Sequence, residues 1–320
     1  MKYYLAPMEG ITGYIYRNAY EKFFHNIDKY FTPFIVTNKG SSLKSKELRD
    51  ALPENNKGIN IVPQMLSNDA EDFINTSRKL QQLGYNEVNL NLGCPAGTVV
   101  SKNRGSGFLA LREELDRFLE EIFKMDDIKI SIKTRIGKTS PEEFYELIKI
   151  YNKYPMEELI IHPRTQKDFY GNKPNLQVFR DAVSLSTNPI CYNGDIFTLQ
   201  DHEEIIKAFP EVNTMMLGRG ILANPGLMDE IRNNINIDKK VLKAFHDEIL
   251  STYVEVYNDE KNAMFRMKEL WGYMIYIFSD NKKYGKKIRK SQNLSEYKNA
   301  VSSLFEEQEI IRGAGLFYSA

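Results

Sequence analysis

Cysteine and histidine, on which disulfide-stapled folds and most metal centres depend, are scarce in this sequence. The 320 residues include two cysteines, Cys94 and Cys191, and four histidines. Two cysteines cannot form a disulfide scaffold or a four-cysteine zinc site, and four scattered histidines leave little for a histidine-based centre. We therefore expect no metal, and a reducing compartment, the cytoplasm.

Long apolar runs and an excess of either charge are also missing. No run approaches the roughly 18 residues that a bilayer span needs, and the N-terminus shows no signal-peptide pattern, so we expect no membrane partner. The 43 Lys and Arg residues balance 43 Asp and Glu residues. This balance argues against bulk binding of polyanions, so any contact with nucleic acid has to come from a local basic patch.

What the sequence does contain is enough apolar material for a large core. Hydrophobic residues make up 42% of the chain and charged residues 27%, which excludes disorder for most of its length. A chain of 320 residues predicts one large domain with an appendage, or two domains.

Strand-like segments recur through the first two thirds of the chain, each bounded by polar or helix-like residues. The eight candidate strands are Tyr3–Ala6, Pro33–Val36, Ile59–Gln64, Glu87–Leu92, Ile128–Lys133, Glu158–His162, Pro189–Asn193 and Asn213–Leu217.

Helix signals lie between several of these strands. Residues Glu114–Phe123 place apolar side chains at helical spacing, and Asn68 opens another helix that stops at Gly84. A capping box with proline at the first helical position, Ser140–Glu143, opens a third. Eight strands with crossover helices predict an α/β fold, a (β/α)8 TIM barrel. An open doubly wound sheet is the alternative.

The central strands separate polar from apolar residues by face. In Glu87–Leu92, Asn89 and Asn91 share one face, and in the next strand Ser131 and Lys133 do, with isoleucines opposite. In a barrel the apolar face packs on the helices and the polar face points into the lumen. A sheet with one solvated face is the alternative interpretation.

After residue 235 the pattern changes to helices alone. We therefore expect two domains, the barrel at residues 1–235 and a small helical domain at residues 236–320. Between the second and third expected helices, six of the nine residues Lys282–Lys290 are basic. The three expected helices are Val241–Asn258, Ala263–Asp280 and Leu294–Ile311.

Polar side chains follow the fourth, fifth and sixth strands, where barrel enzymes form their active sites. Cys94 stands on a turn beside the lumen-facing Asn91, and the long loop after it is typical of a lid or binding loop. Lys133 and Arg135 end the fifth strand on its lumen face, and His162 ends the sixth. A lone cysteine or histidine is usually structural, but this clustering favours a catalytic role.

Paired glycine turns follow the seventh and eighth strands, as Asn193-Gly194-Asp195 and Gly218-Arg219-Gly220. Many barrels hold phosphate there through backbone N–H groups and a cation. Together with a lumenal lysine and a thiol at the mouth, these turns predict a phosphorylated cofactor or substrate beneath a reacting group. The residues alone do not choose among flavin, pyridoxal phosphate and a sugar phosphate.

Six motifs occur in one order at the ends of the predicted strands. They are Leu5-Ala6-Pro7-Met8-Glu9-Gly10, Asn91-Leu92-Gly93-Cys94-Pro95, Lys133-Thr134-Arg135, His162-x-Arg164-Thr165, Asn193-Gly194-Asp195 and Gly218-Arg219. Together they resemble the tRNA-dihydrouridine synthase family, and the resemblance continues into the helical segment. The first motif is most similar to the bacterial DusC branch.

The resemblance implies FMN-dependent reduction of a uridine in tRNA to 5,6-dihydrouridine, with FMN bound tightly but non-covalently and NADPH as the reductant. It implies that Cys94 donates a proton to C5 after hydride transfer from FMN to C6, and that Asn91, Arg135 and Tyr170 face the uracil. The implied flavin-binding residues are Pro7, Met8, Glu9, Gln64, Lys133, His162, Asn193, Gly194, Asp195, Gly218 and Arg219.

The tRNA partner needs the local basic patch that a neutral chain otherwise lacks. The resemblance also favours a monomer. The residues that we expect to contact tRNA are Lys102, Arg104, Lys282, Lys283, Lys286 and Lys287.

Three alternatives stay open. A small-molecule FMN oxidoreductase resembling the dihydroorotate dehydrogenases would leave the helical segment unexplained. A Schiff-base aldolase would use Lys133 without a cofactor. A tRNA-binding module would carry out no chemistry.

Overall fold

The computed structural model describes residues 1–37 and 45–314, and the chain divides into two compact units. The first consists of Met1–Pro7, Asp28–Gly194 and Phe209–Met216, and the second of Met8–Ile27, Asp195–Ala208 and Leu217–Ala320. The helices after residue 236 belong to the second unit, which also includes helices from the earlier sequence. The domain boundary at 235/236 stays a prediction.

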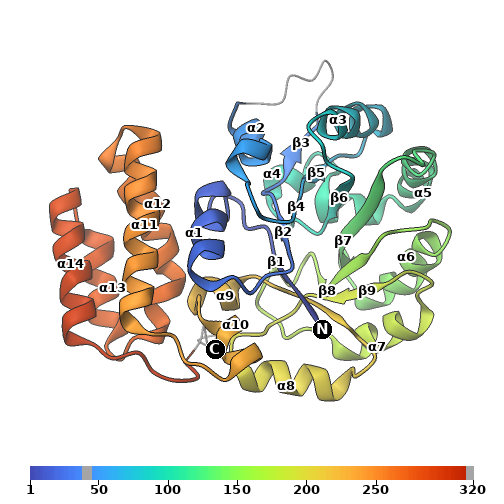
Figure 1. Ribbon diagram of the computed structural model, residues 1–320. Helices are drawn as coiled ribbons and strands as arrows, with labels where there is room; N and C mark the ends of the chain where they lie inside the picture. The colour runs from blue at the N-terminus through green and yellow to red at the C-terminus, as the bar shows by residue number, and fades with distance from the viewer. Residues whose placement is uncertain (38–44, 315–320) are drawn as a thin grey trace. The chain divides into compact units, whose positions relative to one another are not determined.

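All strands in the described residues run parallel in one sheet (Figure 1). The predicted positions are confirmed to within a few residues, and one short strand, β2, lies outside the predicted set. The strands are β1 Lys2–Leu5, β2 Lys29–Phe31, β3 Ile35–Val36, β4 Ile61–Val62, β5 Gln64–Leu66, β6 Glu87–Leu92, β7 Lys129–Gly137, β8 Leu159–Thr165, β9 Ile190–Tyr192 and β10 Thr214–Leu217.

Two strands of the sheet are each interrupted by proline. The strand order is β3-β5-β6-β7-β8-β9-β10-β1-β2-β4, so the two ends are β3 and β4. Only Pro63 separates β4 from β5, and a short turn with Pro33 separates β2 from β3. Proline cannot donate to a strand ladder. Counting each interrupted pair as one strand gives the eight strands of a (β/α)8 barrel, which confirms the predicted fold class.

The barrel lumen is apolar on one side and polar on the other. The polar row along β6 and β7 faces inward, as predicted: Asn89 lies opposite Ser131 and donates to its Oγ at 2.9 Å. Leu90 and Ile132, on the opposite face, are fully buried. The apolar side is a cluster of buried residues from the remaining strands, namely Tyr4, Ala6, Phe31, Val62, Ile160, Cys191 and Met216.

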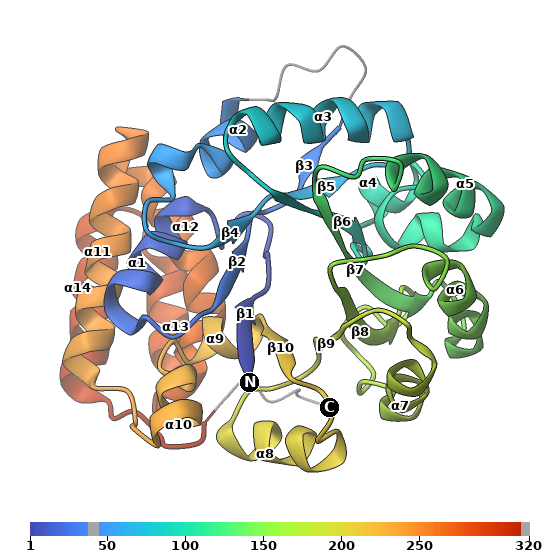
Figure 2. The same ribbon diagram turned by 45° about the vertical axis from the view of Figure 1, so that its right-hand side comes forward.

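Helices cover the outside of β5 to β9 within the first unit (Figure 2). The predicted capping box is confirmed: Ser140 and Glu143 open the short helix η3, Pro141–Glu143, which leads into α6, Phe144–Tyr151. The other helices of this unit are α2 Ser45–Ala51, η1 Pro53–Asn55, α3 Ala70–Gln82, α4 Gly97–Val100, η2 Gly105–Ala110, α5 Arg112–Ile122 and α7 Leu176–Leu185.

The second unit contains the helices that follow residue 236, together with helices from the barrel part of the sequence (Figure 1). Phe245 of α11 makes edge contacts with Tyr16, Tyr20 and Phe24 of α1, with ring centroids 5.2–6.3 Å apart. The helices are α1 Tyr14–Phe24, α8 Leu199–Ala208, α9 Arg219–Ala223, α10 Leu227–Asn233, α11 Lys239–Tyr257, α12 Glu260–Met274, η4 Ile275–Ile277, α13 Asn281–Lys290 and α14 Leu294–Glu307.

The basic segment after α12 is itself a helix, α13, and not a connection between two helices. Asp280 caps it by accepting from the backbone N–H of Lys283. Tyr284 and Ile288, one turn apart, are buried and hold the helix against its neighbours. No helix in the described part of the chain is long and apolar enough to cross a membrane.

Candidate active site

The carboxyl end of β6 carries an amide that fixes the turn leading to Cys94. The Oδ1 atom of Asn91 accepts hydrogen bonds from the backbone N–H groups of Gly93 at 3.0 Å and Cys94 at 2.9 Å. Its Nδ2 atom donates to Gln64 Oε1 at 2.7 Å. Two residues of the predicted site, from neighbouring strands, therefore meet inside the barrel.

The loop after Cys94 folds tightly against it. Ser106 donates to the Cys94 carbonyl oxygen from its backbone nitrogen at 3.1 Å and from Oγ at 2.8 Å. Gly105 has a φ of +55°, and a Cβ there would lie 2.7 Å from the same carbonyl oxygen, so the position requires glycine. The Cys94 side chain stays partly exposed. A lid or binding role for this loop remains a prediction.

Two of the predicted tRNA contacts lie on this loop. Lys102 is exposed, and Arg104 is half-buried with its Nε donating to Asn68 Oδ1 at 3.0 Å. Asn68 in turn donates to the Lys102 carbonyl at 3.1 Å. Asn68 therefore holds the loop in place. It does not cap α3: the cap is its neighbour Asp69, whose carboxylate accepts from the backbone N–H of Asp72.

Lys133 brings a positive charge to the lumen without a neutralising partner. No described residue accepts a hydrogen bond from its ammonium or forms an ion pair with it. Burial is the main cause that lowers the pKa of Lys133, to about 8, and the neighbouring positive charge of Arg135 contributes. A cation in this state favours binding of an anionic group beside it.

Arg135 is fixed by the walls of the barrel mouth. Its side chain is 2% exposed; Nε donates to the Gly93 carbonyl at 2.9 Å and Nη1 to the Thr165 carbonyl at 2.7 Å. The guanidinium carbon lies 5.4 Å from the centroid of the Tyr170 ring. The structure thus brings Arg135, Tyr170 and the Cys94 turn together, and a role for Arg135 and Tyr170 in binding uracil stays a prediction.

His162 lies next to the same tyrosine. The two rings are 6.0 Å apart and edge-on, and His162 Nε2 is 3.2 Å from Arg164 Nη1. Because an arginine N–H can only donate, Nε2 is the acceptor and the ring proton is on Nδ1. Arg164, 1% exposed, was quoted in the sequence motif but not assigned a role in the site.

Asp168 is a second residue outside the predicted set that shapes this region. Its carboxylate accepts from the backbone N–H and the Oγ1 of Thr165, both at 2.8 Å, and closes the turn before Tyr170. Burial opposes ionisation, but the hydrogen bonds from Thr165 and Asn172 and the charge of Arg135 outweigh it and lower the pKa of Asp168. The signal in the sequence is a Thr-x-x-Asp spacing, which is typical of a side-chain-capped turn.

The end of β9 holds Asn193 and Gly194. Asn193 Nδ2 donates to the Met216 carbonyl of β10 at 2.7 Å. A Cβ at Gly194 would lie 2.0 Å from the Tyr192 hydroxyl, so no other residue fits without displacing that tyrosine. The Tyr192 hydroxyl thus occupies the position that a side chain would take, and Gly194 itself is half-buried.

Five of the predicted flavin-binding residues belong to the second unit. Asp195 and Arg219 form an ion pair at 2.7 Å, with both side chains largely buried, and Gly218 precedes α9. Met8 begins a tight turn in which its backbone N–H donates to Thr12 Oγ1 at 2.7 Å. Glu9 in this turn is exposed. Pro7, which precedes Met8, closes the first segment of the first unit.

The basic face of α13 presents four lysines to solvent. Lys282, Lys283, Lys286 and Lys287 lie at least partly exposed on it. Tyr284, in the middle of this run, is fully buried and its hydroxyl donates to Glu307 Oε2. It therefore packs inside the helical unit and is not available for stacking on a base.

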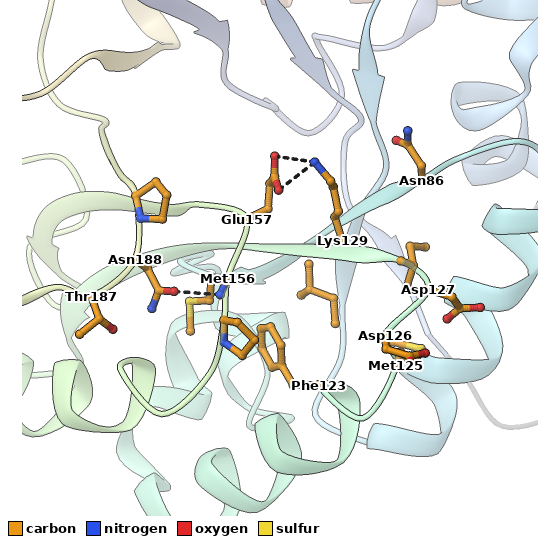
Figure 3. Close-up of a pocket in the computed structure, with 14 residues that line it drawn as sticks. Asn86, Phe123, Met125, Asp126, Asp127, Lys129, Met156, Glu157, Thr187 and Asn188 are labelled. Atoms are coloured by element: carbon orange, nitrogen blue, oxygen red, sulfur yellow. Dashed lines mark hydrogen bonds and ion pairs between the residues drawn. The ribbon is translucent and has the colours of Figure 1, made fainter.

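A cavity of about 810 Å³ opens at the opposite ends of the barrel strands (Figure 3). It is lined by residues at and just before the starts of β6 to β9, including the Lys129–Glu157 ion pair at 3.1 Å. None of the predicted site residues lines it. In the described residues no cluster of three His, Cys, Asp or Glu side chains could hold a metal ion.

The fold and the side chains gathered at its strand ends define a (β/α)8-barrel enzyme with an additional helical unit. A model of the dihydrouridine synthase (Dus) family matches residues 4–315. The chain belongs to the dihydrouridine synthase family, a family of flavin-dependent oxidoreductases. The assignment to the DusC branch stays a prediction.

Relatives in Staphylococcus and Bacillus match most of the chain. The probable tRNA-dihydrouridine synthase of Staphylococcus aureus (strain Mu50) is 26% identical over 282 residues, which cover 85% of this chain and 83% of that protein. Probable tRNA-dihydrouridine synthase 2 of Bacillus subtilis (strain 168) is 28% identical over 228 residues, covering 69% of each.

A solved structure of a morphinone reductase variant in complex with tetrahydroNAD has a TM-score of 0.52 and 11% identity. The match covers 75% of this chain and 89% of the reductase. At this level of identity the likeness shows a shared barrel fold. The family match favours the flavin-dependent interpretation over the aldolase and binding-only alternatives.

Proposed function

We propose that this chain reduces a uridine in tRNA to 5,6-dihydrouridine, using non-covalently bound FMN and NADPH. The observation that carries the proposal is the family match along nearly the whole chain. The side chains at the barrel mouth support it, because the thiol and amide that the reaction needs follow one another at the carboxyl end of β6, and Lys133 lies opposite Asn91 on the neighbouring strand β7.

The lumen offers what a flavin requires. Lys133 is a desolvated cation without a neutralising partner among the described residues, and it would stabilise negative charge at the N1/O2 edge of a reduced isoalloxazine. Gln64 is 1% exposed and would hydrogen-bond the ring edge. Backbone groups beside Gly194 would hold the ribityl chain, and the basic Arg219 would neutralise the phosphate.

When bound, reduced FMN supplies a hydride to C6 of the uracil ring. Negative charge then develops at C5 and O4, and the Cys94 thiol donates its proton to C5. Asn91 holds the Cys94 turn through two backbone N–H groups, and Arg135 and Tyr170 would bind the uracil. The uridine has to leave the tRNA stack to reach these groups.

The tRNA itself would be held by phosphate contacts and shape, because a neutral chain has to rely on local charge. The exposed lysines of α13 would bind the backbone, and Lys102 and Arg104 would bind near the mouth. We expect this function to be carried out in the cytoplasm and to require no metal.

The test is dihydrouridine mapping in tRNA from cells that lack this protein. We expect dihydrouridine to disappear from a defined position and to return when wild-type protein is supplied, but not when Cys94→Ala is supplied. Cys191→Ala, at a buried cysteine in the apolar half of the lumen, is the matched control and should restore the modification. An unchanged dihydrouridine profile in the deletion would contradict the proposal.

A further inference from the structure

A chain of hydrogen bonds runs inside the barrel from the amino-terminal end of β6 to the turn of Cys94. It passes through five buried side chains, which we name the lumen relay: Glu87, Ser131, Asn89, Gln64 and Asn91. Its links are Lys29 Nζ to Glu87 Oε2 (2.8 Å), Ser131 Oγ to Glu87 Oε1 (2.9 Å), Asn89 Nδ2 to Ser131 Oγ (2.9 Å), Gln64 Nε2 to Asn89 Oδ1 (2.8 Å), Asn91 Nδ2 to Gln64 Oε1 (2.7 Å), and the backbone N–H groups of Gly93 and Cys94 to Asn91 Oδ1.

The direction in which the side chains of the relay donate is determined at the Cys94 end. Backbone N–H groups can only donate, so the Asn91 atom that faces them is the oxygen, and its nitrogen faces Gln64. The Gln64 oxygen therefore accepts, and its nitrogen donates to the Asn89 oxygen. The nitrogen of Asn89 then donates to Ser131.

The same direction of donation is required at the Glu87 end. The Ser131 hydroxyl has to donate to the Glu87 carboxylate, so only its oxygen is left for Asn89, whose nitrogen must therefore face it. Glu87 is paired with Lys29, and both side chains are about nine-tenths buried. An ionised carboxylate can only accept. The two ends of the relay thus demand one and the same orientation of all three amides.

This orientation leaves donors inside the barrel. The relay uses one N–H of Gln64 and one of Asn91, and no described residue accepts from the second N–H of either side chain. A group bound against these two amides has to offer acceptors, as the carbonyl groups of a uracil or an isoalloxazine ring do. With the amides reversed, the same positions would offer acceptors and repel those carbonyls.

We propose that Glu87, Ser131 and Asn89 are positioning residues, which fix the orientation of the Gln64 and Asn91 amides and thereby the placement of the Cys94 turn. Asn91 follows Glu87 by four positions along β6, a span of about 13 Å. The inference rests on the proposed function for its catalytic consequence, but the geometry can be tested without tRNA or cofactor.

The test is the rate at which iodoacetamide alkylates Cys94 in the purified protein. The chain has two cysteines, and Cys191 is fully buried, so Cys94 gives the signal and Cys94→Ala is the blank. Ser131→Ala removes the acceptor for Asn89 and allows the amides to reorient. We expect alkylation about fivefold faster than in wild type, the factor that corresponds to one net hydrogen bond.

Three further variants make the result specific. Thr134→Val is the matched control, because Thr134 is a buried residue of the same strand whose hydroxyl bonds Tyr151 and the Arg135 carbonyl, both outside the relay. It should alkylate at the wild-type rate. Ser131→Thr retains the hydroxyl and should also do so. Glu87→Gln replaces the acceptor-only end by an amide that can donate, and should accelerate alkylation as Ser131→Ala does.

Wild-type alkylation rates in both Ser131→Ala and Glu87→Gln would overturn the inference. Equal acceleration in Thr134→Val would also overturn it, since that result reports general loosening of the strand. In tRNA reduction, Ser131→Ala should lower kcat and leave the KM for tRNA unchanged. If the wild-type protein itself fails to reduce tRNA, the proposed function is wrong, while the alkylation rates still decide whether the relay positions Cys94.

Discussion

Two regions of this chain hold positive charge in opposite ways. Lys133 lies in the barrel lumen, where burial lowers its pKa to about 8 and no described residue neutralises it. The four lysines of α13 lie on a solvated helix face, with Tyr284 and Ile288 buried beneath them.

The difference indicates a division of labour. A single charge in a low-dielectric site acts strongly on one bound group. Exposed charges act weakly one by one, add up along a polyanion, and are screened by salt. We therefore expect changes at the mouth to affect the chemical step, and changes on α13 to affect affinity for tRNA and its dependence on salt.

Loss of the thiol should give the largest effect and separate the two regions most clearly. Cys94→Ala should slow single-turnover reduction of tRNA by about 10²- to 10⁴-fold, the usual contribution of a positioned acid. Binding of FMN, measured by flavin absorbance, and the Kd for tRNA should stay unchanged. A variant that binds tRNA more weakly but turns over at the wild-type rate would reverse the assignment.

Removal of the Lys133 charge should give the second-largest effect on the rate. Lys133→Met keeps most of the side-chain volume, and we expect a loss of about 10² to 10³ in the rate of tRNA reduction, as for other single electrostatic groups in active sites. The reduction potential of the bound flavin should fall, because the anionic reduced form loses its counter-charge. Lys133→Arg, which keeps a cation, is the control and should retain part of the potential.

Lys133→Met should lower the activity but raise the stability of the cofactor-free protein. Burial, with Arg135 as a lesser cause, lowers the pKa of Lys133 to about 8, whereas an unfolded lysine titrates near about 10.4. Between these values the unfolded chain binds the proton and the folded chain does not, so the contribution of Lys133 to stability rises with pH. Lys133→Met should therefore be the more stable protein at pH 7, by urea unfolding, with the difference shrinking from pH 8 to 10.

Neutralising the lysines of α13 should give a smaller effect, on the affinity for tRNA and its salt dependence. Replacing Lys282, Lys283, Lys286 and Lys287 by Gln should weaken tRNA binding and reduce the slope of log K against log salt by about 0.7 to 0.9 for each phosphate that the variant no longer binds. NADPH oxidation without tRNA should not change.

A matched set of lysines in the first unit makes that experiment specific. Each of these lysines is paired with an acidic residue, so removing them takes away the same charge without removing an unpaired basic patch. Replacing them should leave the salt dependence of tRNA binding unaltered, and an equal loss in both sets would argue against a tRNA site on α13. The control lysines are Lys124, Lys129, Lys149 and Lys153.

The sequence predicted the central strands of the barrel better than it predicted α13. Period-two alternation in β6 and β7 placed Asn91 and Lys133 on the lumen side, because one face of a buried strand is specified by polarity. The strand β2, Lys29–Phe31, was missed because three residues are too few for a period to show. The Asp195–Arg219 ion pair joins residues far apart in the chain, and no local pattern reports such a contact.

In α13 the local signal was present but was outweighed. The basic segment was placed between two expected helices, yet Tyr284 and Ile288 stand four residues apart, the spacing of a buried helical stripe. Burial of that stripe and the Asp280 cap provide the stabilisation that intrinsic propensity does not. Tertiary packing thus determined the structure of the segment.

The smallest expected effect tests this interpretation of α13. Tyr284→Phe removes the hydroxyl that bonds Glu307 and leaves the ring in place. We expect a loss of stability of about 1 kcal/mol, the usual net worth of one hydrogen bond, and no change in the Kd for tRNA at any salt concentration. A tyrosine whose ring stacked on a base would also keep its Kd for tRNA in this variant, because phenylalanine retains the ring. Tyr284→Leu, which removes the ring, is therefore the deciding variant. For a buried ring it lowers the unfolding midpoint further and weakens tRNA binding only as far as α13 unfolds, whereas a stacking ring would lose affinity at an unchanged midpoint.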